Sequence, residues 1–325
     1  MRWFLFLLAM LLLLGAGLLG AYMLYSRPGP LPRDTAIVIP HGRLAAAIEA
    51  LQEHAALPPG EAARYGFRLA ALLTRNDGPI HAGELEFPAH ASAADLLHVL
   101  RTAHPVQHEL TIPEGLTAAQ IALLVEHAEP LSGPVPVPEE GSVLPETYAF
   151  ERSTPRAVLV GRMQLAMRRS LATIWDGRDP AAGLSGPSEL LRLASMVERE
   201  TAIAAERPMV ARVFLNRLRL GMRLQSDPTV AYAASGGLGL TRPLTRADLA
   251  QPNPYNTYVA TGLPVGAICA PGVASLRAVA HPAPGDALYF VADGTGGHAF
   301  ASDLPDHLRN VARLRARESA AAPAQ

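Results

Sequence analysis

Residues 190–232 read LLRLASMVERETAIAAERPMVARVFLNRLRLGMRLQSDPTVAY, and most of the predicted architecture follows from them. The first part carries apolar or small side chains at the i, i+3, i+4, i+7 spacing that gathers them on one helix face: Leu190, Leu193, Ala194, Val197 and Thr201. The order Glu206-Arg207-Pro208 predicts the start of a second helix, because proline is tolerated in the first helical turn. That helix has an apolar face of its own and is expected to stop at Gly221.

Two glutamates lie at the end of the first predicted helix. Glu198 and Glu200 fall on opposite margins of its apolar stripe, each about 80° from the centre of the stripe at 100° per residue. A carboxyl group at such a margin is partly removed from water, which raises its pKa and lets it hold a proton near neutral pH. A general acid needs this property. Periodicity alone does not choose between the two residues, and it leaves open that both are ordinary solvated helix residues.

The segment 193–232 resembles the signature of the MltG (YceG-like) family of endolytic murein transglycosylases. The likeness continues through further blocks in the same order: LTRADL (244–249), PYNTY (254–258), TGLPVGAICAPGVASLRAVAHP (261–282) and LYFVADGTGGHAF (288–300). Chance is a poor explanation for several long blocks in a fixed order. The resemblance implies an α+β fold, in which a mixed α+β catalytic domain follows a small LysM-like α/β module.

The same resemblance implies an enzyme that cuts nascent peptidoglycan strands internally, between MurNAc and GlcNAc, and thereby terminates glycan elongation. Such an enzyme leaves 1,6-anhydroMurNAc ends, because the C6 hydroxyl of the muramic acid closes onto C1. One glutamate therefore suffices, first as the acid for the leaving oxygen and then as the base for that hydroxyl. The family motif places it at the second glutamate of an ExE pair followed by threonine, which is Glu200 here. Glu198 is the runner-up.

Five further residues are candidates for binding the substrate: Gln225, Asp227, Asn256, Tyr258 and His298. The amides of Gln225 and Asn256 can hydrogen-bond acetamido and hydroxyl groups. PYNTY lies between prolines, so its polar residues are expected on a loop, and the glycines before His298 suit a close approach of the backbone. Structural roles remain open for these residues, such as a turn at Asp227, a loop-stabilising amide at Asn256 and a strand end at His298.

The composition excludes several classes of protein. The chain contains no lysine, and all 28 basic residues are arginines. Pyridoxal phosphate enzymes and Schiff-base aldolases need a lysine amine, so both are excluded. A net charge of −1 with 18% charged residues gives no basic surface for nucleic acid. One cysteine, Cys269, permits neither an internal disulfide nor a thiolate metal cluster, and the histidines show no metal-ligand spacing. We expect no cofactor and no metal site.

Residues 3–25, WFLFLLAMLLLLGAGLLGAYMLY, contain no charged side chain. As a helix they extend about 34 Å at 1.5 Å per residue, enough to cross a hydrocarbon core of about 30 Å. We expect residues 1–25 to be a cytoplasmic amino terminus and a single membrane-spanning helix. Residues 26–34 are expected to be a proline-rich linker that lifts the folded part off the membrane. Positive charges on the two sides nearly balance, so the orientation rests on the resemblance, which implies an inner-membrane protein with its bulk in the periplasm.

Residues 35–106 are expected to form the LysM-like module, in the order strand, helix, helix, strand, helix. The segment has no aromatic platform for stacking on sugars, so a glycan-binding role and a purely structural role are equally open. The catalytic domain is expected over residues 107–318, with a helix over 155–175 and Ser188 as the N-cap of the catalytic helix. Residues 319–325 are expected to be a disordered tail.

Two rival functions remain open at this point. One is a membrane-anchored glycan-binding protein without catalytic activity, and the other is a glycan hydrolase in which Asp227 activates water. The resemblance also implies protein partners among peptidoglycan synthases and division proteins, although no residue identifies them.

Overall fold

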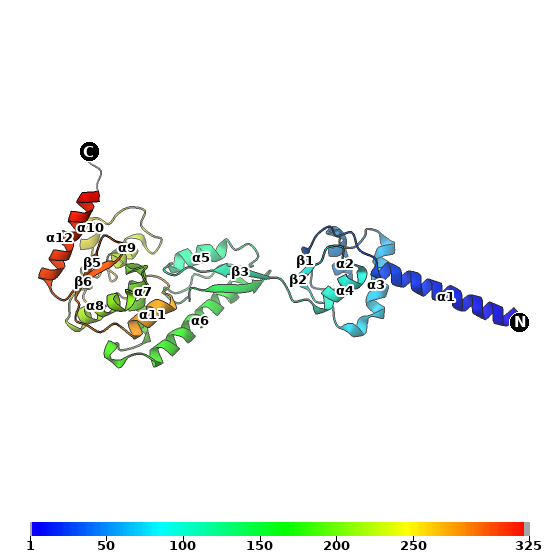
Figure 1. Cartoon of the computed structure of the whole chain (residues 1–325), viewed down its shortest axis with the longest axis horizontal. Helices are drawn as coiled ribbons and strands as arrows, with labels where there is room; N and C mark the ends of the chain where they lie inside the picture. The colour runs from blue at the N-terminus through cyan, green and yellow to red at the C-terminus, as the bar shows by residue number, and fades with distance from the viewer. Residues whose placement is uncertain (1, 322–325) are drawn as a thin grey trace. The chain divides into compact units, whose positions relative to one another are not determined.

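The computed structural model of the chain describes residues 2–321, which form a mixed α+β structure (Figure 1). The chain divides into two compact units: the first runs to His108 and includes Ala149–Ser153, and the second comprises Glu109–Tyr148 and the chain from Thr154 onward. The chain passes from one unit to the other inside strands β3 (Gln107–Thr111) and β4 (Thr147–Glu151), which form one two-stranded sheet.

Helix α1 (Arg2–Ser26) contains the apolar segment predicted to be the anchor. Within residues 2–321 it is the one helix that is long and apolar enough to cross a membrane. Its large side chains are exposed along its length, for example Trp3 at 84% and Leu13 at 75%. A helix that is apolar all round has to be covered by protein or by lipid, so this exposure is consistent with a single-pass anchor.

The rest of the first unit has the predicted order of strand, helix, helix, strand, helix. Its elements are β1 (Thr35–Ile39), α2 (Leu44–Glu53), α3 (Glu61–Leu73), a 3-10 turn η1 (Arg75–Asp77), β2 (Gly83–Phe87) and α4 (Ala93–Thr102). β1 and β2 pair antiparallel, with Ile37 opposite Leu85, and both side chains are fully buried in the core of this unit. The likeness of this unit to LysM modules stays a prediction.

Residues 26–34, predicted to be a proline-rich linker that lifts the folded part off the membrane, pack in part against the first unit. Leu31 is 1% exposed and lies in the core of the first unit. The Gly29 N–H donates to the His90 carbonyl (3.0 Å), and the His90 N–H donates to the Leu31 carbonyl (2.8 Å). A Cβ on Gly29 would collide with the Ala91 carbonyl oxygen, so the contact admits only glycine. The segment packs here because one apolar side chain and its backbone groups find partners on the module.

The second unit is built around helix α7 (Pro187–Glu200), with Leu190, Leu193, Ala194 and Val197 fully buried. Helices α6, α8, α9 and α11 pack against it. Its other elements are α5 (Ala118–Glu126), α6 (Arg156–Asp176), η2 (Pro180–Ala182), α8 (Arg207–Arg219), α9 (Asp227–Ser235), α10 (Arg246–Ala250), α11 (Val273–Ala280), β5 (Tyr289–Ala292), β6 (His298–Ala301) and α12 (Leu304–Ala321). Strands β5 and β6 pair antiparallel as a hairpin.

The two helices predicted within residues 190–232 are confirmed as α7 and α8. Pro208 lies in the first turn of α8, and Gly221 follows its end with a φ of 68°. Ser188 is not the N-cap of α7, because Gly186 holds that position and Pro187 begins the helix. Proline lacks an N–H, which leaves one fewer donor at the helix start to be capped by a side chain.

The helix predicted over 155–175 is confirmed as α6, within one residue at each end. The predicted disordered tail is wrong for residues 319–321, because helix α12 runs to Ala321. The remainder of that tail, residues 322–325, lies outside the described residues.

Candidate active site

Glu200 is the last residue of α7, and its partly buried side chain lies beside the start of α9. The Ser226 hydroxyl donates to Glu200 Oε1 over 2.5 Å. Burial raises the pKa of Glu200 from 4.5 to about 7; the Ser226 hydrogen bond opposes this shift, and the negative charge of Asp227 adds to it. The charges of His298 and Arg217 lower the same pKa. A carboxyl group with such a pKa can give up a proton and take one back at neutral pH.

Ser226 is held by a chain of buried hydroxyl groups. It occupies the N-cap position of α9, yet its side chain makes no capping hydrogen bond and turns to Glu200 instead. Its N–H donates to Thr257 Oγ1 (3.0 Å), and its carbonyl accepts from Thr229 Oγ1 (2.7 Å). The sequence patterns did not single out Ser226. The only signal for it is the serine that directly precedes Asp227-Pro228, a pattern typical of helix starts.

Three of the predicted substrate-binding residues lie close together near Glu200. Tyr258 Oη donates to Asp227 Oδ1 over 2.5 Å, and Asp227 is the exposed first residue of α9. Burial, followed by the hydrogen bond to Asp227, raises the pKa of Tyr258 above its usual value, so its hydroxyl stays a neutral donor. Gln225 is exposed and adopts a left-handed φ of 52°, and its N–H donates to the Thr257 carbonyl (3.1 Å).

Asn256, a candidate for binding the substrate, is buried and hydrogen-bonds within its own loop. It is 0% exposed, and its Nδ2 donates to the carbonyls of Leu249 (3.0 Å) and Gln251 (2.8 Å). Its Oδ1 accepts the Tyr258 N–H (2.9 Å). The amide is therefore occupied inside the loop, as in the alternative structural role, and it shapes the loop that presents Tyr258 rather than facing a substrate.

His298 begins β6 and is held by Glu206. His298 Nδ1 lies 2.7 Å from Glu206 Oε2, and the His298 N–H donates to Glu206 Oε1 (2.8 Å). Although burial opposes it, these hydrogen bonds lower the pKa of Glu206. The Thr201 hydroxyl also donates to Glu206 (3.2 Å), so the Glu206 carboxylate connects the two ends of the loop between α7 and α8. The sequence marked Glu206 only as part of a helix start.

Glu198 lies in a separate, largely buried ion pair. Its side chain is 5% exposed, its Oε1 is 2.9 Å from Arg207 Nη2, and its Oε2 accepts the Gly272 N–H (2.9 Å). Arg207 also reaches Glu114 at 3.4 Å. Both carboxylate oxygens of Glu198 are therefore engaged, and they tie α7 to α8 and to the start of α11.

No group of three or more His, Cys, Asp or Glu side chains within residues 2–321 is arranged to hold a metal ion. Cys269 is fully buried, and its thiol lies 3.3 Å from the Ser195 carbonyl oxygen. Burial raises the pKa of this thiol, so it behaves as a small buried apolar group.

The chain is similar to a known protein family, to curated proteins and to a solved structure. The model of the YceG-like family matches residues 37–313. An endolytic murein transglycosylase of Streptococcus pneumoniae (strain ATCC BAA-255 / R6) is 31% identical over 73% of this chain and 51% of its own length. One of Bacillus subtilis (strain 168) is 36% identical over 52% of this chain and 46% of its own length. The chain thus spans about half the length of the curated relatives it matches. The crystal structure of a yceG-like protein from Listeria monocytogenes aligns with a TM-score of 0.53 and 26% identity, covering 86% of this chain and 99% of that chain.

Proposed function

Since this chain belongs to the YceG-like family, as its motifs predicted, we propose that it is a membrane-anchored lytic transglycosylase that cuts peptidoglycan strands internally. The matched curated relatives bear the name endolytic murein transglycosylase. The observation that carries the proposal is the state of Glu200, a partly buried carboxyl group with a pKa of about 7 and with the Ser226 hydroxyl donating to one of its oxygens.

The proposed reaction uses Glu200 twice. The Glu200 carboxyl first gives its proton to the glycosidic oxygen, while the bond between that oxygen and C1 of the muramic acid breaks. The Glu200 carboxylate then takes the proton of the C6 hydroxyl, whose oxygen forms a bond to C1. The products are a 1,6-anhydroMurNAc end and a free hydroxyl on the leaving sugar. Glu200 has its proton back, and no water is consumed.

The neighbours of Glu200 have separate tasks in this scheme. Ser226 stabilises the carboxylate that exists between the two steps, because its hydroxyl already points at Oε1. The negative charge of Asp227 opposes an early ionisation of Glu200 and favours the positive charge that develops at C1. Gln225, Tyr258 and His298 are proposed to bind sugar groups. Asn256 is proposed to act through the loop that presents Tyr258.

A glycan hydrolase is the second candidate function, and the position of Asp227 is the observation that supports it. Asp227 is exposed, and its charge raises the pKa of Glu200, so two carboxyl groups share one cluster. Hydrolases use such a pair, with the second carboxylate activating water or attacking the sugar. In this chain Asp227 Oδ1 already accepts a hydrogen bond from Tyr258, so this oxygen is occupied and does not face a water molecule freely.

Mass spectra of the products separate these functions. The full-length protein in detergent is incubated with purified sacculi, and a Glu200→Gln variant serves as the matched control. We expect glycan fragments of many lengths that end in anhydroMurNAc, each lighter by one water than the corresponding hydrolysis product. Reducing MurNAc ends would support the hydrolase. Binding to sacculi without any cleavage by the parent would support a non-catalytic glycan-binding protein.

We further propose that α1 spans the inner membrane and that the second unit lies outside the cytoplasm, where nascent strands are made and where these cuts end their elongation. Peptidoglycan synthases and division proteins are the proposed partners at that place. A cysteine introduced at the exposed Val137 tests the orientation, since a membrane-impermeant maleimide should label it in intact spheroplasts. Labelling only after lysis would reverse the proposed topology.

A further inference from the structure

Helix α3 of the first unit has two apolar faces, and only one of them lies in the core. Phe67 and Ala71 are buried there. The opposite face consists of residues at the spacing i, i+3, i+4, i+7, i+10, i+11, which form one continuous stripe: Ala62, Tyr65, Gly66, Leu69, Leu72 and Leu73. The four large side chains of this stripe are 57–74% exposed. An exposed apolar stripe of this length marks a surface that is covered by something else.

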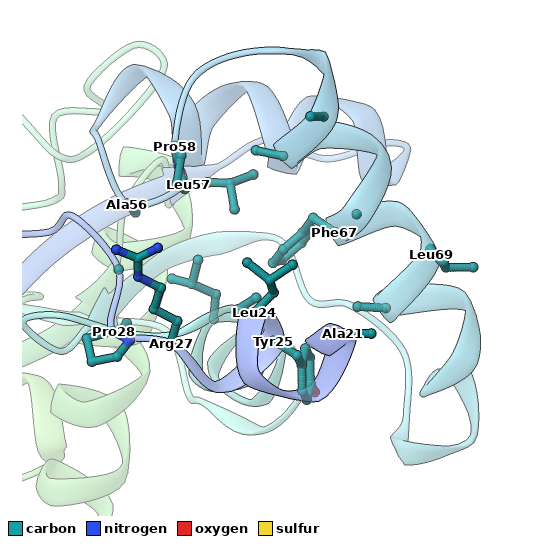
Figure 2. Close-up of a pocket in the computed structure, with 18 of the residues that line it drawn as sticks. Ala21, Leu24, Tyr25, Arg27, Pro28, Ala56, Leu57, Pro58, Phe67 and Leu69 are labelled. Atoms are coloured by element: carbon teal, nitrogen blue, oxygen red, sulfur yellow. The ribbon is translucent and has the colours of Figure 1, made fainter. Parts of the chain in front are cut away.

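The stripe adjoins the end of α1. A groove of about 870 Å³ is lined by both helices, with Tyr22 and Tyr25 on the side of α1 and Gly66, Leu69 and Leu73 on the side of α3. Figure 2 shows this groove, with Leu24 and Tyr25 of α1 beside it and Phe67 of α3 facing it. The apolar surface of the anchor therefore continues onto α3.

The segment that joins α1 to the rest of the first unit is packed against the core of that unit. Tyr25, in the last turn of α1, packs against the core of this unit, and Leu31 lies inside that core. The backbone between them is hydrogen-bonded to the module through Gly29. Where α1 leaves a membrane, α3 therefore lies at the membrane surface.

The aromatic residues of α1 indicate the depth at which this occurs. Trp3 and Tyr22 are separated by about 28 Å at 1.5 Å per residue, close to the hydrocarbon thickness of about 30 Å. Trp and Tyr prefer the two interfaces of a bilayer, which puts Tyr22 and Tyr25 at the level of the lipid headgroups. Tyr65 of α3 has the same character, and the Arg68 guanidinium lies 5.9 Å from its ring centre, where it can meet lipid phosphates.

We propose that α3 lies in the lipid interface beside α1, with its exposed stripe inserted at the boundary between headgroups and acyl chains. Amphipathic helices of this kind bind membranes by burying one apolar face. The lipid bilayer is the partner because the stripe continues the surface of α1 and because it contains Tyr65, with Arg68 beside it. The inference rests on the proposed membrane-spanning role of α1, and the experiment tests the two separately.

Spin labels on single cysteines measure the depth of each helix. Full-length protein, with the buried Cys269 replaced by alanine, is placed in vesicles of phosphatidylethanolamine and phosphatidylglycerol. Labels are attached in separate samples to Leu11→Cys in α1, Leu69→Cys in α3 and Glu86→Cys in β2. These three side chains are exposed, so the labels leave the core intact, and circular dichroism checks the fold. Relaxation by oxygen reports contact with lipid, and relaxation by a water-soluble nickel chelate reports contact with water.

We expect lipid contact at Leu69, shallower than at Leu11, and full water contact at Glu86. If Leu69 resembles Glu86 while Leu11 is in lipid, α3 lies in water and the inference is refuted while the anchor stands. If the label at Leu69 is shielded from both reagents and broadened by a second label, another copy of the chain covers α3 and the inference is also refuted. If Leu11 is in water, the anchor and the inference fall together.

Discussion

Replacing Glu200 with glutamine should nearly abolish cleavage and should also make the second unit more stable at neutral pH. Burial raises the pKa of Glu200 from 4.5 to about 7, which means that the folded protein disfavours the ionised carboxylate. The parent therefore has its full stability below about pH 4.5 and loses part of it as the pH rises through 7. Glutamine has the same shape and can accept the Ser226 hydrogen bond, but it never ionises.

The size of the effect follows from the shift of the pKa. The difference between 7 and 4.5 is 2.5 pH units, and at 1.36 kcal/mol per unit it amounts to about 3 kcal/mol. At pH 4 both proteins carry a neutral side chain at position 200, so the difference in their stability from this ionisation is close to zero. At pH 8 this difference approaches its full value, and the variant is the more stable protein. Loss of the transferable proton should lower the cleavage rate by about 10²–10⁴-fold.

Urea unfolding of both proteins in detergent, from pH 4 to pH 8, measures this difference. Trp175 packs against the core of the second unit and reports its unfolding by fluorescence. The second tryptophan, Trp3 in α1, is replaced by phenylalanine in both proteins so that it adds no signal. The gap between the two unfolding free energies should widen in favour of Glu200→Gln as the pH rises. A gap that stays constant across this range would refute the raised pKa and, with it, the proposed role of Glu200 as the proton donor.

Three other substitutions test separate parts of the structure. Glu198→Gln should cost about 3 kcal/mol of stability, since it breaks the largely buried pair with Arg207; a variant that unfolds like the parent but fails to cleave would instead make Glu198 catalytic. His298→Asn removes a charge that lowers the pKa of Glu200, so the decline of kcat/KM on the alkaline side should move to higher pH; an unmoved decline contradicts the electrostatic contact. Leu31→Ala should destabilise the first unit by about 2–5 kcal/mol, measured by calorimetry; no change in its Tm would mean that this segment does not belong to the core.

Helices α7 and α8 were predictable because their signals are local. Each signal concerns only a few neighbouring residues: the apolar stripe from Leu190 to Val197, the proline at 208 and the glycine at 221. In the structure the stripe is buried, the proline lies in the first turn of α8 and the glycine follows the end of α8. Thr117 acts just as locally, because it forms a capping box with Gln120 three residues later at the start of α5. Local patterns thus predicted the helices of the first unit and helices α6, α7 and α8 of the second.

The remaining features depend on contacts between residues far apart in the chain. Nothing near Glu206 in the sequence indicates that its carboxylate meets His298, which lies in a strand 92 residues later. Glu198 and Glu200 had equivalent positions on the helical projection, and only the family resemblance chose Glu200. The structure adds a physical difference between them, because Arg207 and Gly272 engage Glu198. The composition of residues 26–34 predicted a proline-rich spacer, and nothing in that composition indicates that Leu31 is buried in the core of the first unit.

That buried leucine also has a mechanical consequence. A free spacer of nine residues would be an entropic spring with an end-to-end distance on the order of 17 Å, and it would absorb small displacements of whatever the protein holds. Because Gly29 is hydrogen-bonded to the module and Leu31 is buried in its core, residues 29–31 cannot extend and contract in this way. Under the proposed function, a pull on a bound glycan strand that reaches the first unit would pass directly to α1, because no flexible spacer lies between the module and that helix.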